Sequence, residues 1–200
     1  YRDSDGALEA LVDFHLVTKW KTAGDSLLAA RKLAREDSRN ILIIGAGTVA
    51  RSLVQAYSAA FPEASFTVWN RTHANALAFA ASIPGMAVAE NLEHAVKAAD
   101  IITSATMTTE PNLKGEWLQA GQHVDLIGAY RPDMREVDDE ALRRSRIFVD
   151  SFDTTVGHIG ELKIPLAAGV ISRGDLVADY YDLSRFSRTA DSDITLFKNG

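Results

Sequence analysis

The segment Asn40–Ala50, which reads NILIIGAGTVA, determines the fold class of this chain. Its four apolar residues at 41–44 form a continuous run, which is typical of a strand covered by helices on both faces of a parallel sheet. The run leads directly into the pattern Gly45-x-Gly47-x-x-Ala50. Gly45 suits a tight turn, Gly47 has no Cβ to block a pyrophosphate, and Ala50 lets the next helix pack close to the strand. The segment predicts a strand, a glycine turn and a helix arranged to bind a dinucleotide.

The residues after the glycines supply context that a bare GxGxxA pattern lacks, since glycines also serve ordinary turns. An amphipathic helix is predicted over 48–60, and a second strand over 65–69 follows at the spacing of a βαβ unit. The first turn of that helix contains Thr48 and Val49. It offers unpaired backbone N–H groups and the positive end of the helix dipole to a phosphate. Nucleotide binding is therefore the leading hypothesis.

The tripeptide Asn70-Arg71-Thr72 at the end of the second strand selects between cofactors. NAD sites place Asp or Glu about 20 residues after the glycines to bind the ribose 2′-hydroxyl, whereas an arginine accommodates the 2′-phosphate of NADP. This chain has no carboxylate there, and a guanidinium beside two small hydrogen-bonding side chains suits a phosphate. We therefore expect NADP(H) to be favoured, with NAD(H) as the alternative. A solvated surface arginine and a turn-forming asparagine are the plainer interpretation.

Strands and helices continue to alternate as far as Asp150. The expected helices cover residues 73–82, 92–98, 116–120 and 139–145, and the expected strands cover residues 86–89, 100–104, 123–128 and 146–150. Six strands alternating with helices predict an α/β domain of the Rossmann type, with a doubly wound parallel sheet. Ser104, Thr106 and Gly128 fall at carboxyl ends of strands, where such a sheet binds its ligand, so we include them among the candidate cofactor contacts. A simple polar loop is the alternative for the first two.

Composition excludes several other classes of protein. The 200 residues are 46% hydrophobic and carry a net charge of −6, which gives one good core and no basic surface for nucleic acid. There is no cysteine, and the five histidines lack the i,i+4 spacing of metal ligands, so we expect no metal site. No apolar run approaches the ~20 residues of a membrane span, and no signal peptide opens the chain. A cytoplasmic location is the default expectation.

The two ends of the chain have a looser pattern. Residues 1–12 suggest a strand, a turn at Asp5-Gly6 and a second strand, and because the chain starts without methionine we expect a preceding segment. A helix is predicted over 16–34. After residue 151, we expect a helix or a partly buried surface segment at 176–183 and a strand at 194–197, with more chain to follow.

Several blocks of this sequence together resemble the ornithine cyclodeaminase and mu-crystallin family. They are, in the family's order, TKWKTAG at 18–24, GAGTVA at 45–50, WNRT at 69–72, IGAYRPDMREVD at 127–138, VDS at 149–151 and DITLFK at 193–198. The resemblance spans nearly the whole chain. It implies homodimeric enzymes in which a Rossmann domain is inserted between two parts of a substrate and dimerisation domain. It also implies a small imino or amino acid as substrate.

The resemblance suggests a division of this chain into three parts. Residues 1–34 are expected to be a connector and part of the substrate and dimerisation domain, residues 35–155 the NAD(P)-binding domain, and residues 156–200 a return toward the first domain. The family's usual acid/base lysine belongs to an N-terminal portion that precedes this chain. We therefore expect the fragment by itself to bind cofactor and to lack turnover.

Two departures from the family patterns narrow the expected chemistry. Lys21 stands where the family commonly has an arginine that grips the substrate carboxylate, and a lysine holds a carboxylate as a point charge without the bidentate fork. Tyr130 stands where true ornithine cyclodeaminases have an aspartate. We therefore expect an NAD(P)H-dependent reductase of an imino acid or ketimine, with Lys21 on the substrate carboxylate and Tyr130 as a substrate contact or a buried tyrosine. The alternatives are an ornithine cyclodeaminase, an alanine dehydrogenase-like enzyme, and a non-catalytic protein that binds NADPH or a small ligand.

Overall fold

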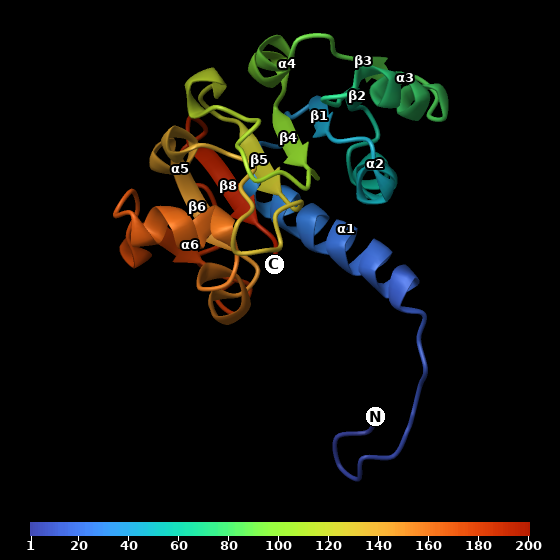
Figure 1. Ribbon diagram of the computed structural model, residues 1–200, viewed down its shortest axis with the longest axis vertical. Helices are drawn as coiled ribbons and strands as arrows, with labels where there is room; N and C mark the ends of the chain where they lie inside the picture. The colour runs from blue at the N-terminus through green and yellow to red at the C-terminus, as the bar shows by residue number, and fades with distance from the viewer.

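Strands and helices alternate along the chain from Asn40 to Ala178, and a last strand then ends at Lys198 (Figure 1). The computed structural model describes residues 1–200. The strands are β1 Asn40–Ile44, β2 Ser65–Trp69, β3 Ala87–Val88, β4 Ile101–Ser104, β5 His123–Leu126, β6 Ser145–Val149, β7 Leu176–Ala178 and β8 Ile194–Lys198. The helices are α1 Phe14–Leu33, α2 Thr48–Ala60, α3 His73–Ala81, α4 Leu92–Ala98, α5 Asp139–Arg144 and α6 Gly160–Ala167. The predicted strands and α-helices between 40 and 150 are confirmed, but a 3₁₀ turn, Gly115–Trp117, replaces the short helix expected at 116–120.

All eight strands form one parallel sheet in the order β3-β2-β1-β4-β5-β8-β6-β7. The strand order reverses between β1 and β4, because the chain builds outward to β3 before it returns to the other side of β1. This reversal is the topological switch point, outside which open α/β sheets bind their ligands at the carboxyl ends of the strands. The predicted α/β, doubly wound class is therefore confirmed. Two strands, β7 and β8, come from the stretch 156–200, and β8 lies between β5 and β6.

The alternating side chains of β1 show how the two faces of the sheet are covered. Ile41 and Ile43 belong to a core that includes residues of α1, α2 and α3, while Leu42 and Ile44 belong to a second core with residues of α4, α5 and α6. All four side chains are almost completely buried. A continuous apolar run is what a parallel strand needs when helices cover both of its faces. This double cover leaves the carboxyl ends of the strands as the accessible edge for a ligand.

The first 13 residues project away from the sheet (Figure 1) and form no strand. A turn is present, with Gly6 at φ +69°, but the two strands expected on either side of it are wrong. Two isolated strands are marginal in water without a third strand or a core to cover, and every residue of this segment is exposed. Helix α1 begins after Asp13, whose carboxylate accepts hydrogen bonds from the backbone N–H groups of His15 (2.8 Å) and Leu16 (3.1 Å).

The segment 176–183 does not form a helix. Its first three residues form β7, which pairs in parallel with β6 at the edge of the sheet, and the residues after Ala178 make a turn. Leu176 and Ala178 are buried in the hydrophobic clusters that flank the sheet. A short apolar segment next to an existing sheet edge gains interstrand hydrogen bonds as well as burial. A short helix would have to form its costly first turn without that sheet edge. The strand expected at 194–197 is confirmed as β8. None of the helices is both long and apolar enough to cross a membrane.

Candidate functional site

The glycine turn lies at the carboxyl end of β1, beside the switch point. Gly45 has φ +112°, which side-chain-bearing residues rarely adopt, and a Cβ there would lie 2.8 Å from the carbonyl oxygen of Ala105. The Gly45 N–H donates to the Trp69 carbonyl oxygen (2.8 Å), which extends the hydrogen bonding between β1 and β2 to the start of the turn. A Cβ at Gly47 would meet no atom within 4 Å. Gly45 is thus required by the local backbone, whereas Gly47 leaves free space in front of α2.

The start of α2 is open to a ligand. Gly47 is its N-cap residue and gives no side-chain hydrogen bond to the first turn. The first-turn N–H groups, including those of Thr48 and Val49, therefore lack the side-chain acceptor that ordinarily caps a helix, and they carry the positive end of the helix dipole. Thr48 is exposed and Val49 is partly buried. An anionic group such as a pyrophosphate fits this end of the helix.

A cavity of about 370 Å³ opens in front of this turn. It lies between the segments that follow β1, β2 and β4, and its lining contains Gly45, Gly47, Trp69, Asn70, Arg71, Thr72 and residues 105–108. Six of the residues predicted to contact the cofactor line it, namely Gly45, Gly47, Asn70, Arg71, Thr72 and Thr106. Their roles stay predictions, but the fold brings them together around one crevice.

The end of β2 forms one wall of this crevice. The side-chain amide of Asn70 donates to the Thr72 carbonyl oxygen (2.9 Å), so Asn70 holds the turn that leads into α3. Arg71 is exposed, lines the crevice and is absent from the ion pairs of the structure. Its guanidinium is therefore free to accept an anionic partner. No carboxylate lines the crevice.

Ser104 and Gly128 do not line the cavity but lie directly beneath it. The Ser104 side chain is buried and donates to Glu136, and a side chain at Gly128 would overlap the backbone of Thr106. The segments after β4 and β5 are thus packed backbone against backbone. These two residues shape the floor of the crevice, and a direct contact with a cofactor stays a prediction for both.

A set of buried charged residues lies behind this floor, and none of them was among the predicted site residues. They are Asp125, Glu136, Glu161 and Lys198, all at or close to complete burial. Burial raises the pKa of Asp125 to about 7. Burial and the neighbouring Glu136 carboxylate raise the pKa of Glu161 to about 7, and burial lowers the pKa of Lys198. A charged residue inside an apolar strand pattern was the available signal for Asp125 and Lys198, while nothing in the local sequence marks Glu136.

Lys21 and Tyr130 lie away from the crevice lining. Lys21 is exposed on α1, with its Nζ 3.0 Å from Asp25 Oδ2 and 3.3 Å from the carbonyl oxygen of Gly200. It therefore lies beside the residues that follow β8, at the carboxyl edge of the sheet. Tyr130, in the segment after β5, is 59% exposed, so the alternative of a buried tyrosine is wrong. Their predicted contacts with a substrate stay predictions.

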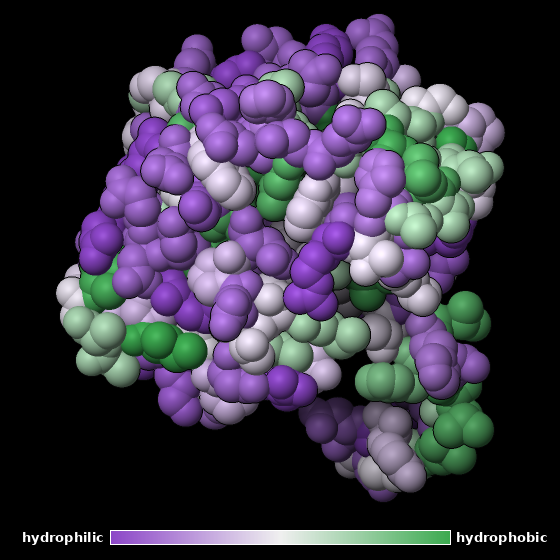
Figure 2. All heavy atoms as spheres, turned by 45° about the horizontal axis from the view of Figure 1, so that its top comes forward, coloured by the Kyte–Doolittle hydropathy of each residue, from purple (hydrophilic) through white to green (hydrophobic).

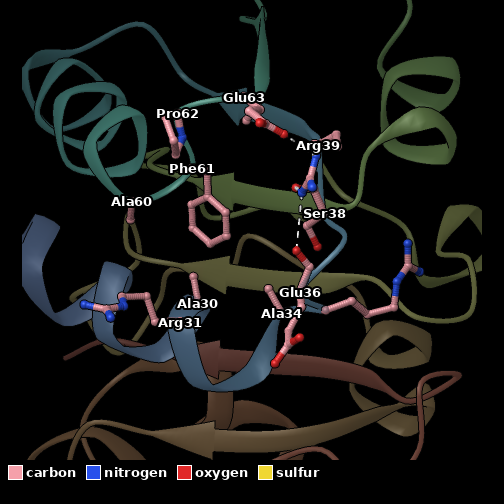
Figure 3. A pocket seen from close by; sticks show the side chains of 12 residues that line it. Ala30, Arg31, Ala34, Glu36, Ser38, Arg39, Ala60, Phe61, Pro62 and Glu63 are labelled. Carbon is pink, nitrogen blue, oxygen red and sulfur yellow. Dashed lines mark hydrogen bonds and ion pairs between the residues drawn. The ribbon is translucent and has the colours of Figure 1, made fainter.

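A second cavity, of about 390 Å³, lies at the opposite end of the strands (Figure 3). The end of α1, the segment before β1 and the loop between α2 and β2 line it, and Arg39 pairs there with Glu63 (3.4 Å). It contains none of the predicted cofactor contacts. Because parallel sheets bind ligands at the carboxyl ends of their strands, the crevice at Gly45 is the candidate dinucleotide site.

The doubly wound sheet and the glycine turn at its switch point define a protein of the Rossmann class. Within that class, the chain belongs to the ornithine cyclodeaminase/mu-crystallin family, whose sequence profile matches residues 2–200.

Two relatives and one solved structure illustrate the similarity. The Delta(1)-pyrroline-2-carboxylate reductase of Paracoccus denitrificans is 48% identical over 98% of this chain and 65% of the relative. The ketimine reductase mu-crystallin of Mus musculus is 34% identical over 98% of this chain and 61% of the relative. The Thermococcus litoralis Delta(1)-pyrroline-2-carboxylate reductase, solved in complex with NADH and L-proline, superimposes with a TM-score of 0.92 at 31% identity and covers 98% of this chain and 64% of that one. The chain therefore spans less than two thirds of these relatives.

Proposed function

We propose that the protein is an NAD(P)H-dependent oxidoreductase that reduces the C=N bond of an imino acid or ketimine. The crevice carries this proposal, because it combines the glycine turn, the uncapped start of α2 and a wall of small polar residues at the switch point. The similarity to Delta(1)-pyrroline-2-carboxylate reductases and to ketimine reductase mu-crystallin supports the same chemistry. Tyr130 in place of the aspartate expected of a cyclodeaminase also favours a reductase.

In this proposal, each part of the chain has a defined task. The N–H groups at the start of α2 bind the pyrophosphate, with Gly47 leaving room for its approach. Arg71 binds the 2′-phosphate at the end of β2, which favours NADP(H) over NAD(H). Lys21 binds the carboxylate of the imino acid, and Tyr130 contacts the substrate. A reduced nicotinamide, when bound, supplies the hydride to the imine carbon.

The test is an assay of the full-length protein with cyclic imino acids such as Delta(1)-pyrroline-2-carboxylate. We expect consumption of NADPH or NADH in equal amount to the amino acid formed. Ammonia release from ornithine without added cofactor would indicate a cyclodeaminase, and NAD reduction by L-alanine would indicate an alanine dehydrogenase. Cofactor binding without any turnover would indicate a non-catalytic binding protein.

We further propose that the protein is a cytoplasmic homodimer, in which residues 1–34 take part in the substrate and dimerisation region. The N-terminal arm and the start of α1 support the dimer, because Leu8, Leu11, Phe14, Leu16 and Trp20 are each more than half exposed. Apolar side chains appear in green along the arm that projects at the lower right of Figure 2. Several exposed apolar side chains on one segment are typical of an interaction site. Light scattering of the full-length protein tests the dimer, and a monomer would contradict it.

A further inference from the structure

One buried carboxylate connects the two loops that form the floor of the crevice. Glu136 is completely buried and lies in the segment between β5 and α5. Its Oε1 accepts hydrogen bonds from the Ser104 hydroxyl (2.6 Å), the Thr106 N–H (2.8 Å) and the Thr106 hydroxyl (2.9 Å). Its Oε2 accepts from the N–H groups of Gly128 (2.6 Å) and Ala129 (3.1 Å). One oxygen therefore holds the segment after β4 and the other holds the segment after β5.

The geometry requires an acceptor at both oxygens. Three of the five donors are backbone N–H groups, which cannot reverse their role, so an ionised carboxylate satisfies all of them at once. The backbone that carries the Glu136 side chain is also held in place, because the N–H groups of Glu136 and Val137 donate to the Glu161 carboxylate (2.7 and 3.2 Å). Burial raises the pKa of Glu136, while the positive charge of Lys198 and the hydrogen bonds from Ser104 and Thr106 oppose that rise and favour the ionised form. The cluster is thus built around the position of Glu136.

The two loops that Glu136 holds lie on the second half of the sheet. In a doubly wound sheet, the glycine turn and the end of β2 serve the adenosine half of a dinucleotide. The other half of the cofactor must then extend past the switch point, over the ends of β4 and β5. Residues 105–108, which follow β4, already line the crevice. Glu136 therefore sets the position of that segment relative to the backbone at Gly128.

We infer that Glu136 is a positioning residue for the nicotinamide half of the cofactor, because it fixes the spacing between the loops after β4 and β5. This inference rests on the proposed function, since it requires a dinucleotide in the crevice. Glu136 touches neither substrate nor cofactor, and it acts through the backbone of Thr106 and Gly128. A residue that only stabilised the fold would affect both halves of the cofactor alike.

The experiment compares two ligands on the full-length protein and its Glu136→Gln variant. Glutamine has the same shape, but in either orientation its NH2 group faces at least one backbone N–H donor, that of Thr106 or those of Gly128 and Ala129, so one of the two loops loses its acceptor. We expect the Kd for the preferred reduced dinucleotide, NADPH or NADH, to rise about tenfold. The Kd for the adenosine half alone, 2′,5′-ADP or AMP, should change less than about twofold. Fluorescence titration and calorimetry give these two constants.

A matched control and a milder variant keep the result interpretable. Asp138→Asn makes the same carboxylate-to-amide change in the same segment, where the side-chain oxygen accepts from Gly115 (2.8 Å) and Ala141 (2.9 Å) outside the crevice. It should leave both constants unchanged. Ser104→Ala removes one of the five hydrogen bonds, and it should weaken dinucleotide binding in the same direction by a smaller factor. If Glu136→Gln does not fold, Ser104→Ala becomes the deciding variant.

Three outcomes are distinct. Weaker binding of the dinucleotide alone supports the inference. Unchanged dinucleotide binding by Glu136→Gln overturns the inference, as does an equal loss of affinity for both ligands. The same criteria apply to Ser104→Ala where it is the deciding variant. A wild-type protein that binds neither NADPH nor NADH contradicts the proposed function itself, which is a different result from either of these.

Discussion

Replacing the buried Asp125 with asparagine is expected to change how the stability of the protein depends on pH. Asp125 lies in β5 with no exposed surface, and its Oδ2 accepts from the hydroxyls of Tyr57 (3.2 Å) and Thr103 (3.0 Å). Its Oδ1 has no hydrogen-bond partner. Burial raises the pKa of Asp125 from its ordinary value of 3.8 to about 7, although the hydroxyl donors and the charge of Lys198 oppose this rise.

The magnitude follows from the difference between the folded and unfolded pKa values of Asp125. Between pH 3.8 and about 7 the folded chain keeps a proton that the unfolded chain has lost, so the free energy of unfolding falls as the pH rises through this window. About 3 pH units at 1.36 kcal/mol each give about 4 kcal/mol. Asparagine carries no titrating proton, so Asp125→Asn removes this loss. Its unpaired amide costs about 1–3 kcal/mol at every pH.

The assay is urea unfolding of wild type and Asp125→Asn at several pH values from about 4 to about 8, a range that covers the window above. We expect the variant to gain about 4 kcal/mol relative to wild type from the acidic to the neutral end. Glu161, with a pKa raised to about 7, changes stability in the same direction, and buried His123, with a pKa lowered by burial to about 3, changes it in the opposite direction. Both are present in the two proteins and cancel in the difference. A difference that stays constant with pH would contradict this prediction, because Asp125 would then titrate alike in the folded and unfolded states.

Three further predictions concern the crevice and the substrate. Arg71→Ala should raise the Kd for NADPH about tenfold in a fluorescence titration, because a charge-assisted contact is lost, and it should have little effect on the Kd for NADH. The control is Arg51→Ala, because Arg51 lies on α2 outside the crevice lining. Gly45→Ala should cost about 2 kcal/mol of stability or more in urea unfolding, because φ is +112° and a backbone oxygen lies 2.8 Å from the added Cβ. Gly47→Ala should leave stability nearly unchanged and weaken only dinucleotide binding, and equal effects of the two glycine variants would contradict the assignment. Lys21→Met in the full-length protein should raise KM for the imino acid about tenfold or more with a smaller change in kcat, and an unchanged KM in steady-state kinetics would remove Lys21 from the substrate site.

The elements around the glycine turn were predictable because their causes are local. An apolar run, a glycine that needs positive φ and an amphipathic stretch lie next to one another in Asn40–Ala60, and β1, the turn and α2 form there as expected. The crevice residues were predictable for the same reason. Gly45, Arg71 and Thr106 each follow a strand, and parallel strands bring their carboxyl ends to one edge.

The N-terminal segment and the edge strand β7 were not predictable from their own residues. A short apolar run beside a turn forms a strand only where a partner strand exists, and residues 1–12 have none. In contrast, β7 forms because the edge of β6 is available to it. The presence or absence of a neighbouring strand is a property of the whole fold, so the sequence pattern could not separate the two cases.

Local sequence patterns were enough to predict the Rossmann class and the residues that surround the crevice, since hydrophobic periodicity and glycine positions act over a few residues. Two features emerge only in the folded chain: β8 enters the sheet between β5 and β6, and Glu136 reaches the ends of β4 and β5 with five hydrogen bonds. The physical reason is that a buried carboxylate is tolerated wherever enough donors converge on it, and those donors come from segments up to 32 residues away in the chain. No local pattern records that convergence.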